Sequence, residues 1–147
     1  MKVKPTIGWR EWVALPDLGV DWVKAKVDTG ARSSTLHAWD IEVDEGTAQV
    51  RFTVHPLQDD DAIVIATSAP LVEQREVRSS NGEVEIRPVI STIAIVGASA
   101  NTIELTLSNR DEMGFRMLLG RSAIRRRFVV DPGRSFLGGG DRVTAPS

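Results

Sequence analysis

The amino-acid sequence predicts an all-β domain, arranged as a closed barrel or a sandwich, with one short helix near the C-terminal end. Three observations support this fold class. Apolar residues alternate with polar ones in several segments, which is the period of a half-buried strand. β-branched residues are frequent in these segments, and turn signals separate them at short intervals. Helical periodicity is scarce, so almost no segment favours another class.

The expected strands can be placed by the faces that their apolar residues form. In residues 22–27, Val23, Ala25 and Val27 share one face and lysines occupy the other. Residues 47–55 and 102–107 alternate in the same way, with apolar faces made by Ala48, Val50, Phe52 and Val54 and by Ile103, Leu105 and Leu107. Residues 62–66 and 89–96 are denser apolar runs, which are typical of strands covered on both faces.

Turn signals lie between these segments, at residues 16–19, 45–46, 81–82 and 97–99. Asn81-Gly82 is the strongest of them, because a type I′ turn needs positive φ at both central residues. It would join residues 73–79 to residues 83–89 as a long polar hairpin.

The C-terminal part of the chain changes character twice. Residues 121–127, directly after Gly120, form the one stretch that reads as helical. From about residue 138 the sequence becomes Gly-rich and then polar, with no periodicity. We therefore expect one folded domain over residues 1–137 and a disordered tail over residues 138–147.

Composition and charge limit the function. The chain of 147 residues has the length of a single domain, and its formal net charge of −2 gives no global basic field for nucleic acid. It has no cysteine, which excludes disulfides, thiolate metal sites and a cysteine nucleophile. No apolar run reaches membrane-spanning length, and the N-terminus is too polar to begin a signal peptide. The sequence thus predicts a cytoplasmic protein without membrane or nucleic-acid partners.

Asp28-Thr29-Gly30 is the first candidate for chemistry, because it directly follows the alternating strand at residues 22–27. The strand would hold the carboxylate in place, and the glycine would let the backbone turn sharply behind it. Backbone N–H groups and the threonine hydroxyl could then bond around the carboxylate. The same tripeptide is also a common turn composition, so its meaning depends on the rest of the chain. Residues 33–38 could form a second strand after it.

A second motif, Leu118-Leu119-Gly120-Arg121, stands further along the chain, directly before the expected helix. Retropepsins carry two hydrophobic residues and a glycine before their single helix, and that strand crosses beneath the Asp-Thr-Gly loop. The hairpin turn at residues 81–82 falls between the two motifs, where retropepsins place the flap that covers the substrate. The order of these three features resembles a retropepsin-type aspartic peptidase.

Longer segments make the resemblance more specific. They are residues 7–11, 26–32, 54–57, 75–82, 109–121 and 130–135. Together they resemble a bacterial family once labelled ATP-dependent zinc protease and now grouped with the retropepsin-like peptidases. This family includes the Rim-operon peptidase that accompanies a RimK-type glutamate ligase. The match covers roughly residues 6–137.

The resemblance implies a closed, six-stranded-type acid-protease barrel with Asp28, Thr29 and Gly30 as its catalytic loop. It also implies a peptidase that removes or trims the glutamate tails that the ligase adds to ribosomal protein S6, or that acts on a similar acidic substrate. The fold and the catalytic class transfer more directly than the substrate does.

One Asp-Thr-Gly provides only half of such a site. Aspartic peptidases use two carboxylates about 3 Å apart that share one proton. A symmetric homodimer is therefore the simplest expectation, although the Gly-rich tail looks poorly suited to sealing a dimer. A monomer would instead need Asp111, Glu112 or Asp131 as its second acid.

Basic residues near the two motifs predict an acidic substrate. Retropepsins usually carry an acidic residue after Asp-Thr-Gly-Ala, and it pairs with the arginine that follows the downstream glycine; here that position is Arg32. Arg32 and Arg121 would then both lie near the site, beside Ala31, and arginine binds carboxylates bidentately. In the hairpin, Arg78 and Asn81 could contact the same substrate.

Other arginines could contribute to this basic surface. They are Arg75 in the hairpin, Arg116, and the run at residues 125–127. Charged runs and exposed hairpins are also polar simply because they face water. Arg121 could equally pair with neighbours of Asp28, or with acids at residues 111–112.

The residues give little support to a zinc or ATP site. His37 and His55 are the only histidines, and the sequence has no His-Glu-x-x-His pair and no thiol. No Gly-rich phosphate loop is present, and no nucleophile elbow marks a serine. We therefore expect no cofactor and no metal. Two functions remain: an aspartic peptidase, and a non-catalytic module that recognises acidic peptides or partners a glutamate ligase.

Overall fold

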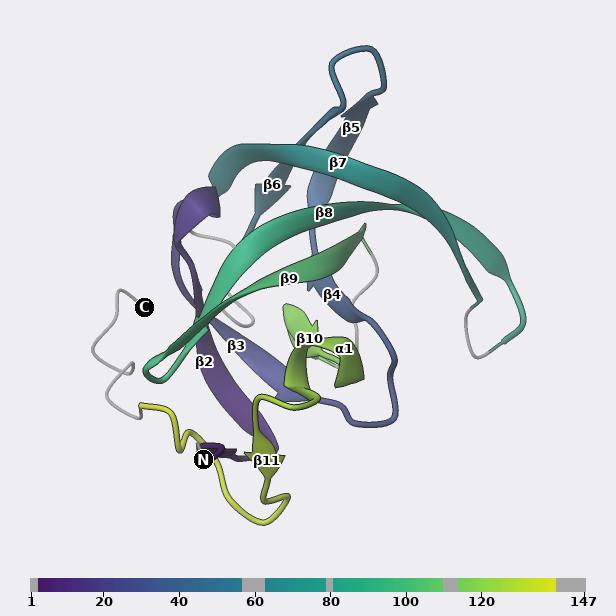
Figure 1. The fold of residues 1–147 in the computed structure, drawn as a ribbon. Helices are drawn as coiled ribbons and strands as arrows, with labels where there is room; N and C mark the ends of the chain where they lie inside the picture. The colour runs from purple at the N-terminus through teal and green to yellow at the C-terminus, as the bar shows by residue number, and fades with distance from the viewer. Residues whose placement is uncertain (1–2, 57–62, 79–80, 110–113, 140–147) are drawn as a thin grey trace.

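The computed structural model describes residues 3–56, 63–78, 81–109 and 114–139 of the chain. Six strands pair in a ring and form a closed barrel, which confirms the all-β class and excludes the sandwich (Figure 1). In ring order they are β2 (Arg10–Leu15), β3 (Val20–Val27), β10 (Met117–Leu119), β4 (Ser34–His37), β9 (Ser99–Ser108) and β8 (Val84–Val96). Ala14 of β2 pairs with Ile95 of β8 and closes the ring, so that each of the six strands has a paired neighbour on both sides.

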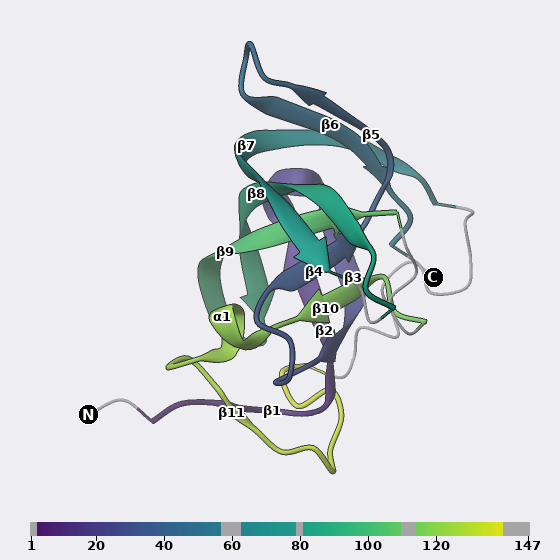
Figure 2. The same ribbon diagram turned by 90° about the vertical axis from the view of Figure 1, so that its right-hand side faces the viewer.

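The sheet continues beyond β8 as β7 (Ile65–Arg78), β6 (Gln49–Val54) and β5 (Trp39–Asp44), which lie at the top of Figure 1. At the other end of the barrel, β1 (Thr6–Ile7) and β11 (Val129–Val130) pair in parallel. The short helix α1 (Arg121–Ile124) follows β10, and the 3-10 turn η1 (Pro16–Leu18) joins β2 to β3. Figure 2 shows β5 and β6 on the far side of β7 from the barrel. Within the described residues, no helix is long and apolar enough to cross a membrane.

The alternation expected from the sequence is present in the barrel wall. Val23 and Ala25 of β3 are fully buried, whereas Asp21 on the same strand is exposed. Ile103, Leu105 and Leu107 of β9 enter the same core from the other side. Residues 89–96 of β8 include no exposed residue, as expected for a strand covered on both faces.

The structure differs from three local expectations. Ala48 belongs to the turn before β6 and is exposed with φ 54°, because the strand begins only at Gln49. The run at residues 62–66 is not covered on both faces: Val64 is 55% exposed, since β7 lies on the extension of the sheet. Residue 62 itself lies outside the described residues. Helix α1 ends at Ile124 rather than at residue 127, because Arg125 is extended and Arg126 has φ 69°.

The long hairpin is present as β7 and β8, whose last pair is Arg78 with Val84. Gly82 has φ 86°, the left-handed conformation expected of a turn glycine. Residues 79–80 lie outside the described residues. The hairpin leaves the barrel on the side where β4 and the loop before it lie (Figure 2), so it is placed as the sequence predicts for a flap.

Glu11 anchors the C-terminal segment to the barrel. Its side chain is fully buried in β2 and accepts hydrogen bonds from the N–H groups of Gly8 (2.7 Å), Leu137 (2.8 Å) and Gly138 (2.9 Å). Phe136 stacks on Trp12 with ring centroids 5.5 Å apart. Gly138 is therefore held against the barrel, although the tail was expected to begin there. Residues 140–147 lie outside the described residues, so disorder of the rest of the tail stays a prediction from the sequence.

Candidate active site

Strand β3 ends at Val27 and delivers Asp28 to the end of the barrel. The N–H of Asp28 donates to the carbonyl of Leu119 in β10 (2.9 Å), and the N–H of Val27 donates to the carbonyl of Trp9 (2.8 Å). β10 pairs with β3 in parallel and with β4 antiparallel, so it lies between the strands on either side of the loop. The predicted crossing of the Leu-Leu-Gly strand beneath Asp-Thr-Gly is therefore confirmed.

The Asp28 carboxylate is held by one oxygen. Its Oδ1 accepts the N–H groups of Gly30 (3.0 Å) and Ala31 (3.2 Å), which closes a tight turn over the side chain. Its Oδ2 accepts no hydrogen bond from any residue that the structure describes, and the residue is only half-buried. The Thr29 hydroxyl was expected to bond around the carboxylate, but it makes no hydrogen bond with the described part of the chain. One oxygen is thus positioned by the backbone, while the other has no hydrogen-bond partner among the described residues.

Gly120 allows the loop to rest directly on β10. A Cβ at this position would lie 2.4 Å from the Ser33 carbonyl oxygen and 3.0 Å from that of Ala31. The N–H of Gly120 donates to the buried Oγ of Ser34 (3.0 Å), and the N–H of Arg121 donates to the carbonyl of Ala31 (2.8 Å). Only glycine fits so close an approach between two backbones. The downstream motif therefore supports the Asp-Thr-Gly loop directly.

The Arg121 side chain holds the Asp-Thr-Gly loop through two hydrogen bonds. Its Nη1 donates to the carbonyls of Thr29 (3.1 Å) and Gly30 (3.0 Å). Among the alternatives left open by the sequence, this contact is the one in which Arg121 pairs with neighbours of Asp28. The Arg121 side chain therefore positions the loop. Arg32 is exposed, and its side chain makes no hydrogen bond or ion pair with the residues that the structure describes. Arg32 is thus available to an anion beside the loop.

Two of the predicted hairpin residues organise the turn itself. Arg78 donates through Nη1 to the carbonyl of Gly82 (3.1 Å), and the Asn81 side-chain oxygen accepts the N–H of Glu83 (3.2 Å). Their contact with a substrate stays a prediction.

Arg75 connects the hairpin to the loop. Its Nη1 lies 3.5 Å from the Ser33 Oγ, and its Nη2 bonds Glu104 (3.2 Å) and Glu73. The hydrogen bond that Arg75 donates to Glu73, and to a lesser extent the one it donates to Glu104, raises the pKa of the Arg75 guanidinium. Two carboxylates therefore occupy this arginine at the edge of the site.

A model of the RimB-like family, described as retropepsin-like aspartic endopeptidase RimB, matches residues 6–139, which include every residue of this site. The chain belongs to the RimB-like family. It is 46% identical over 132 residues to a protein of Shewanella halifaxensis named probable alpha-L-glutamate ligase, a match that covers 88% of this chain and 29% of that protein. A protein of Parasynechococcus marenigrum with the same name is 47% identical over 135 residues, covering 90% and 29%.

This RimB-like chain thus spans less than a third of the length of these relatives. The crystal structure of a protein of unknown function from Legionella pneumophila has the same fold, with a TM-score of 0.73 and 29% identity. That alignment covers 92% of this chain and 99% of the Legionella chain.

The two histidines of this RimB-like chain do not share a metal. The indole of Trp39 stands between their rings, with centroids 3.9 Å from His37 and 4.0 Å from His55. The guanidinium carbon of Arg116 lies 5.1 Å from the centroid of the same indole. Arg116 directly precedes β10, whereas the Asp28 N–H bonds to Leu119, the last residue of that strand. Among the described residues, no group of three or more histidines and carboxylates could hold a metal ion. The part of the chain that the structure describes therefore offers no donor set for the zinc of the family's older label.

Asp131, one candidate for the second acid of a monomeric site, lies beside the β1–β11 pair, and its role as that acid stays a prediction. Its Oδ1 accepts the N–H of Gly133 (3.0 Å), and its own N–H donates to Ile7 at the β1–β11 pair (2.8 Å). Asp111 and Glu112 lie outside the described residues.

Some residues that shape the site carry no visible signal in the sequence. Ser34 receives the Gly120 N–H, and Glu104 holds Arg75, yet both look like ordinary strand residues. Only the pairing of β4 with β9 and β10 brings them to the loop.

Proposed function

We propose that this protein is an aspartic-type peptidase that trims glutamate tails from ribosomal protein S6 or from a similarly acidic substrate. The observation that carries the proposal is the state of Asp28. Two backbone N–H groups hold Oδ1, and Oδ2 accepts no hydrogen bond from the described residues, in a half-buried residue at the end of a barrel strand. The backbone already fixes the orientation of this carboxylate. The side chain therefore loses little further conformational freedom when it takes a proton from water.

The reaction needs a second carboxylate, which we assign to Asp28 of a second copy of the chain. The ionised member of the pair takes a proton from water, whose oxygen bonds to the scissile carbonyl carbon. The protonated member donates a hydrogen bond to the carbonyl oxygen, since two like charges at this separation cannot both ionise. Collapse of the tetrahedral intermediate breaks the C–N bond, and the leaving nitrogen receives the proton that the first carboxylate took from water.

The acidic substrate is supported by the arginines and by the relatives. Arg32 is exposed beside the loop and makes no ion pair with the residues that the structure describes. A guanidinium binds a carboxylate through two parallel hydrogen bonds, which suits glutamyl side chains. The relatives named probable alpha-L-glutamate ligase contain a segment 46–47% identical to this chain, which supports a functional link to glutamate ligation.

The test is cleavage of glutamate-extended S6, followed by mass spectrometry, beside a neutral peptide of similar length. We expect the wild type to shorten the glutamate tail and to leave the neutral peptide intact. Asp28→Asn keeps the shape of the side chain and should abolish cleavage. Asp21→Asn is the matched control, because Asp21 is an exposed carboxylate on the same strand. Equal cleavage by Asp28→Asn and Asp21→Asn would refute the role of Asp28.

The competing function is a binding module that keeps the barrel and recognises acidic peptides without cutting them. It is favoured by the free Arg32 and by the single carboxylate of the chain's loop. It predicts no cleavage by the wild type, and a loss of peptide binding in Arg32→Ala. Light scattering tests the shared site separately, because an active protein that is strictly monomeric would exclude the symmetric pair of Asp28 carboxylates.

A further inference from the structure

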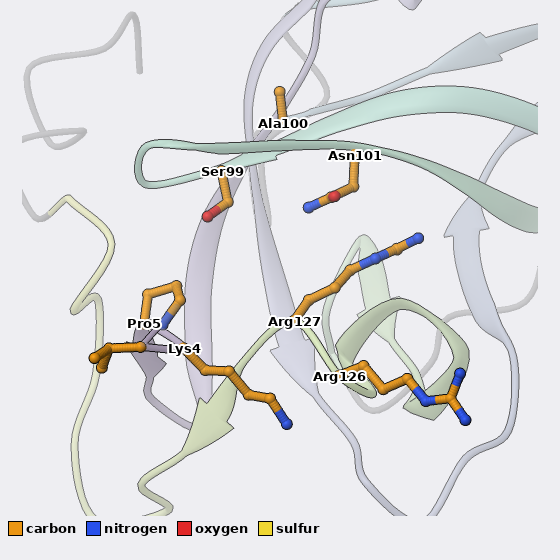
Figure 3. Close-up of a pocket in the computed structure, with 8 residues that line it drawn as sticks. Lys4, Pro5, Ser99, Ala100, Asn101, Arg126 and Arg127 are labelled. Carbon is orange, nitrogen blue, oxygen red and sulfur yellow. The ribbon is translucent and has the colours of Figure 1, made fainter. Parts of the chain in front are cut away.

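A basic groove lies on the far side of α1 from the catalytic loop. It has a volume of about 360 Å³ and is lined by three segments of the chain. These are Val3, Lys4 and Pro5 before β1, Ser99, Ala100 and Asn101 at the start of β9, and Arg126 and Arg127 after α1. Figure 3 shows Ser99 and Asn101 reaching from β9 toward the side on which Lys4 and the two arginines lie. We refer to these eight residues as the basic groove.

The charge of the groove has one sign. Its lining includes three cationic side chains and no carboxylate, although the whole chain has a net charge of −2. None of the three cations forms an ion pair with a residue that the structure describes. Lys4 and Arg126 are exposed, and Arg127 is half-buried with its Nη1 3.5 Å from the carbonyl of Ala123. The hydroxyl of Ser99 and the amide of Asn101 add neutral donors to the same wall.

The backbone holds Arg126 in the groove at a cost. Arg125 has φ −55° and ψ 129°, Arg126 has φ 69°, and the N–H of Arg127 donates to the carbonyl of Ile124 (3.0 Å). These are the features of a type II turn, whose third position strongly prefers glycine. An L-residue with a side chain loses roughly 1–2 kcal/mol in this conformation. Residues held in unfavourable backbone conformations cluster at functional sites.

We infer that the basic groove binds glutamate side chains of the acidic substrate, away from the bond that is cut. This inference rests on the proposed function and extends it from the catalytic loop to a second binding site. The two sites are joined by α1: Arg121 at its start contacts the catalytic loop, and the turn after its end forms the groove. A helix rises about 1.5 Å per residue and an extended peptide about 3.3 Å. The four residues of α1 therefore span about 6 Å, a length that about two residues of an extended glutamate tail match.

Carboxylates suit the groove better than nucleic acid does. Its volume is at the lower end of the range for small-molecule pockets, so it holds a short stretch of side chains rather than a duplex. Nucleic-acid binding draws on many phosphate contacts over a wide basic surface, and this chain is acidic overall. Two guanidiniums and an ammonium opposite neutral donors match a pair of neighbouring glutamates.

The experiment measures binding of a fluorescently labelled oligoglutamate peptide by anisotropy, with every variant built on Asp28→Asn so that no cleavage can occur. Arg126→Gly should raise the urea midpoint, because glycine suits the turn, and should weaken binding about two- to fivefold, as expected for one exposed charge pair. Replacing Lys4, Arg126 and Arg127 together by glutamine should weaken it by roughly tenfold or more, if the charges act independently. Arg51→Gln, on the exposed face of β6, is the control and should bind like the parent.

Unchanged peptide affinity in Arg126→Gly and in the triple variant would overturn the inference. So would tighter binding of a single-stranded oligonucleotide with the same number of charges. Because affinity is measured without cleavage, the two ideas fail separately. An inactive wild type would refute the peptidase activity, and the affinities would still decide whether the groove binds glutamate. With an active enzyme, Arg126→Gly should raise KM for long glutamate tails and leave kcat and the cleavage of short tails unchanged.

Discussion

Gly120→Ala adds one methyl group where β10 passes beneath the Asp-Thr-Gly loop. The new Cβ would lie 2.4 Å from the Ser33 carbonyl oxygen and 2.6 Å from its carbonyl carbon. Close C–H···O contacts are ordinarily about 3.3 Å or longer, so the Ser33 carbonyl has to retreat by roughly 1 Å. The φ of Gly120 is −92°, which any residue can adopt, so the effect of the methyl is steric.

The segment that would be displaced adjoins the candidate active site. Ser33 follows the loop that holds Asp28, and overpacking of this kind costs about 1–3 kcal/mol of unfolding free energy. A misplacement of about 1 Å in a catalytic group can lower the rate by roughly 100-fold. We therefore expect Gly120→Ala to stay folded, to lose about 1–3 kcal/mol, and to lose most of its cleavage of glutamate-extended S6.

Urea unfolding at equilibrium measures the first effect and mass spectrometry the second. Gly46→Ala is the matched control, because a Cβ there meets only the Asp44 Oδ1, at 3.4 Å, in an exposed turn. If Gly120→Ala is as stable and as active as Gly46→Ala, the close seating of the loop on β10 is refuted. Loss of stability with full activity would show instead that the loop tolerates the shift.

Three further predictions test other contacts. Glu11→Gln keeps the side-chain size but leaves one acceptor oxygen for three N–H groups, one buried and two part-buried; we expect a loss of roughly 2–5 kcal/mol in urea unfolding, and a loss below about 1 kcal/mol would contradict the anchoring role. Arg121→Met removes the donor to Thr29 and Gly30, and should lower kcat while changing stability by less than about 1 kcal/mol, since the side chain is exposed. The hydrogen bond from the Thr47 N–H lowers the pKa of Asp44 when the chain is folded, so this contribution to stability is present above the ordinary carboxyl range and is lost as the pH falls through the folded pKa. Asp44→Ala should therefore unfold at lower urea than the wild type at neutral pH and at nearly the same urea in strong acid; a difference that persists in acid would refute this linkage.

Much of the fold could be predicted because it depends on neighbours along the chain. The alternation of Val23, Ala25 and Val27 states which face of a strand is buried, whatever that strand pairs with. Glycines at turn positions, such as Gly19 and Gly82, indicate reversals of the chain direction, because a left-handed φ is costly for other residues. The same local rules failed for Arg126, which takes a left-handed φ without being glycine and ends the helix early.

The candidate site could be predicted only in part. Asp28 and Leu118-Leu119-Gly120 are visible as motifs, and the family resemblance states their order. The bracing by Arg121 was one of several alternatives, because its guanidinium meets carbonyls 92 and 91 positions away in the sequence. Nor does any pattern in the sequence indicate that Trp39 separates His37 from His55.

The sequence by itself determined the all-β class, the buried faces of the main strands and the loop that presents Asp28, because these follow from periods of two residues and from turn chemistry. Closure of the barrel decided the rest. It set β10 between β3 and β4, placed Ser33 against Gly120, and brought three distant segments together around the basic groove. Such contacts depend on strand register over the whole ring, which no local pattern specifies.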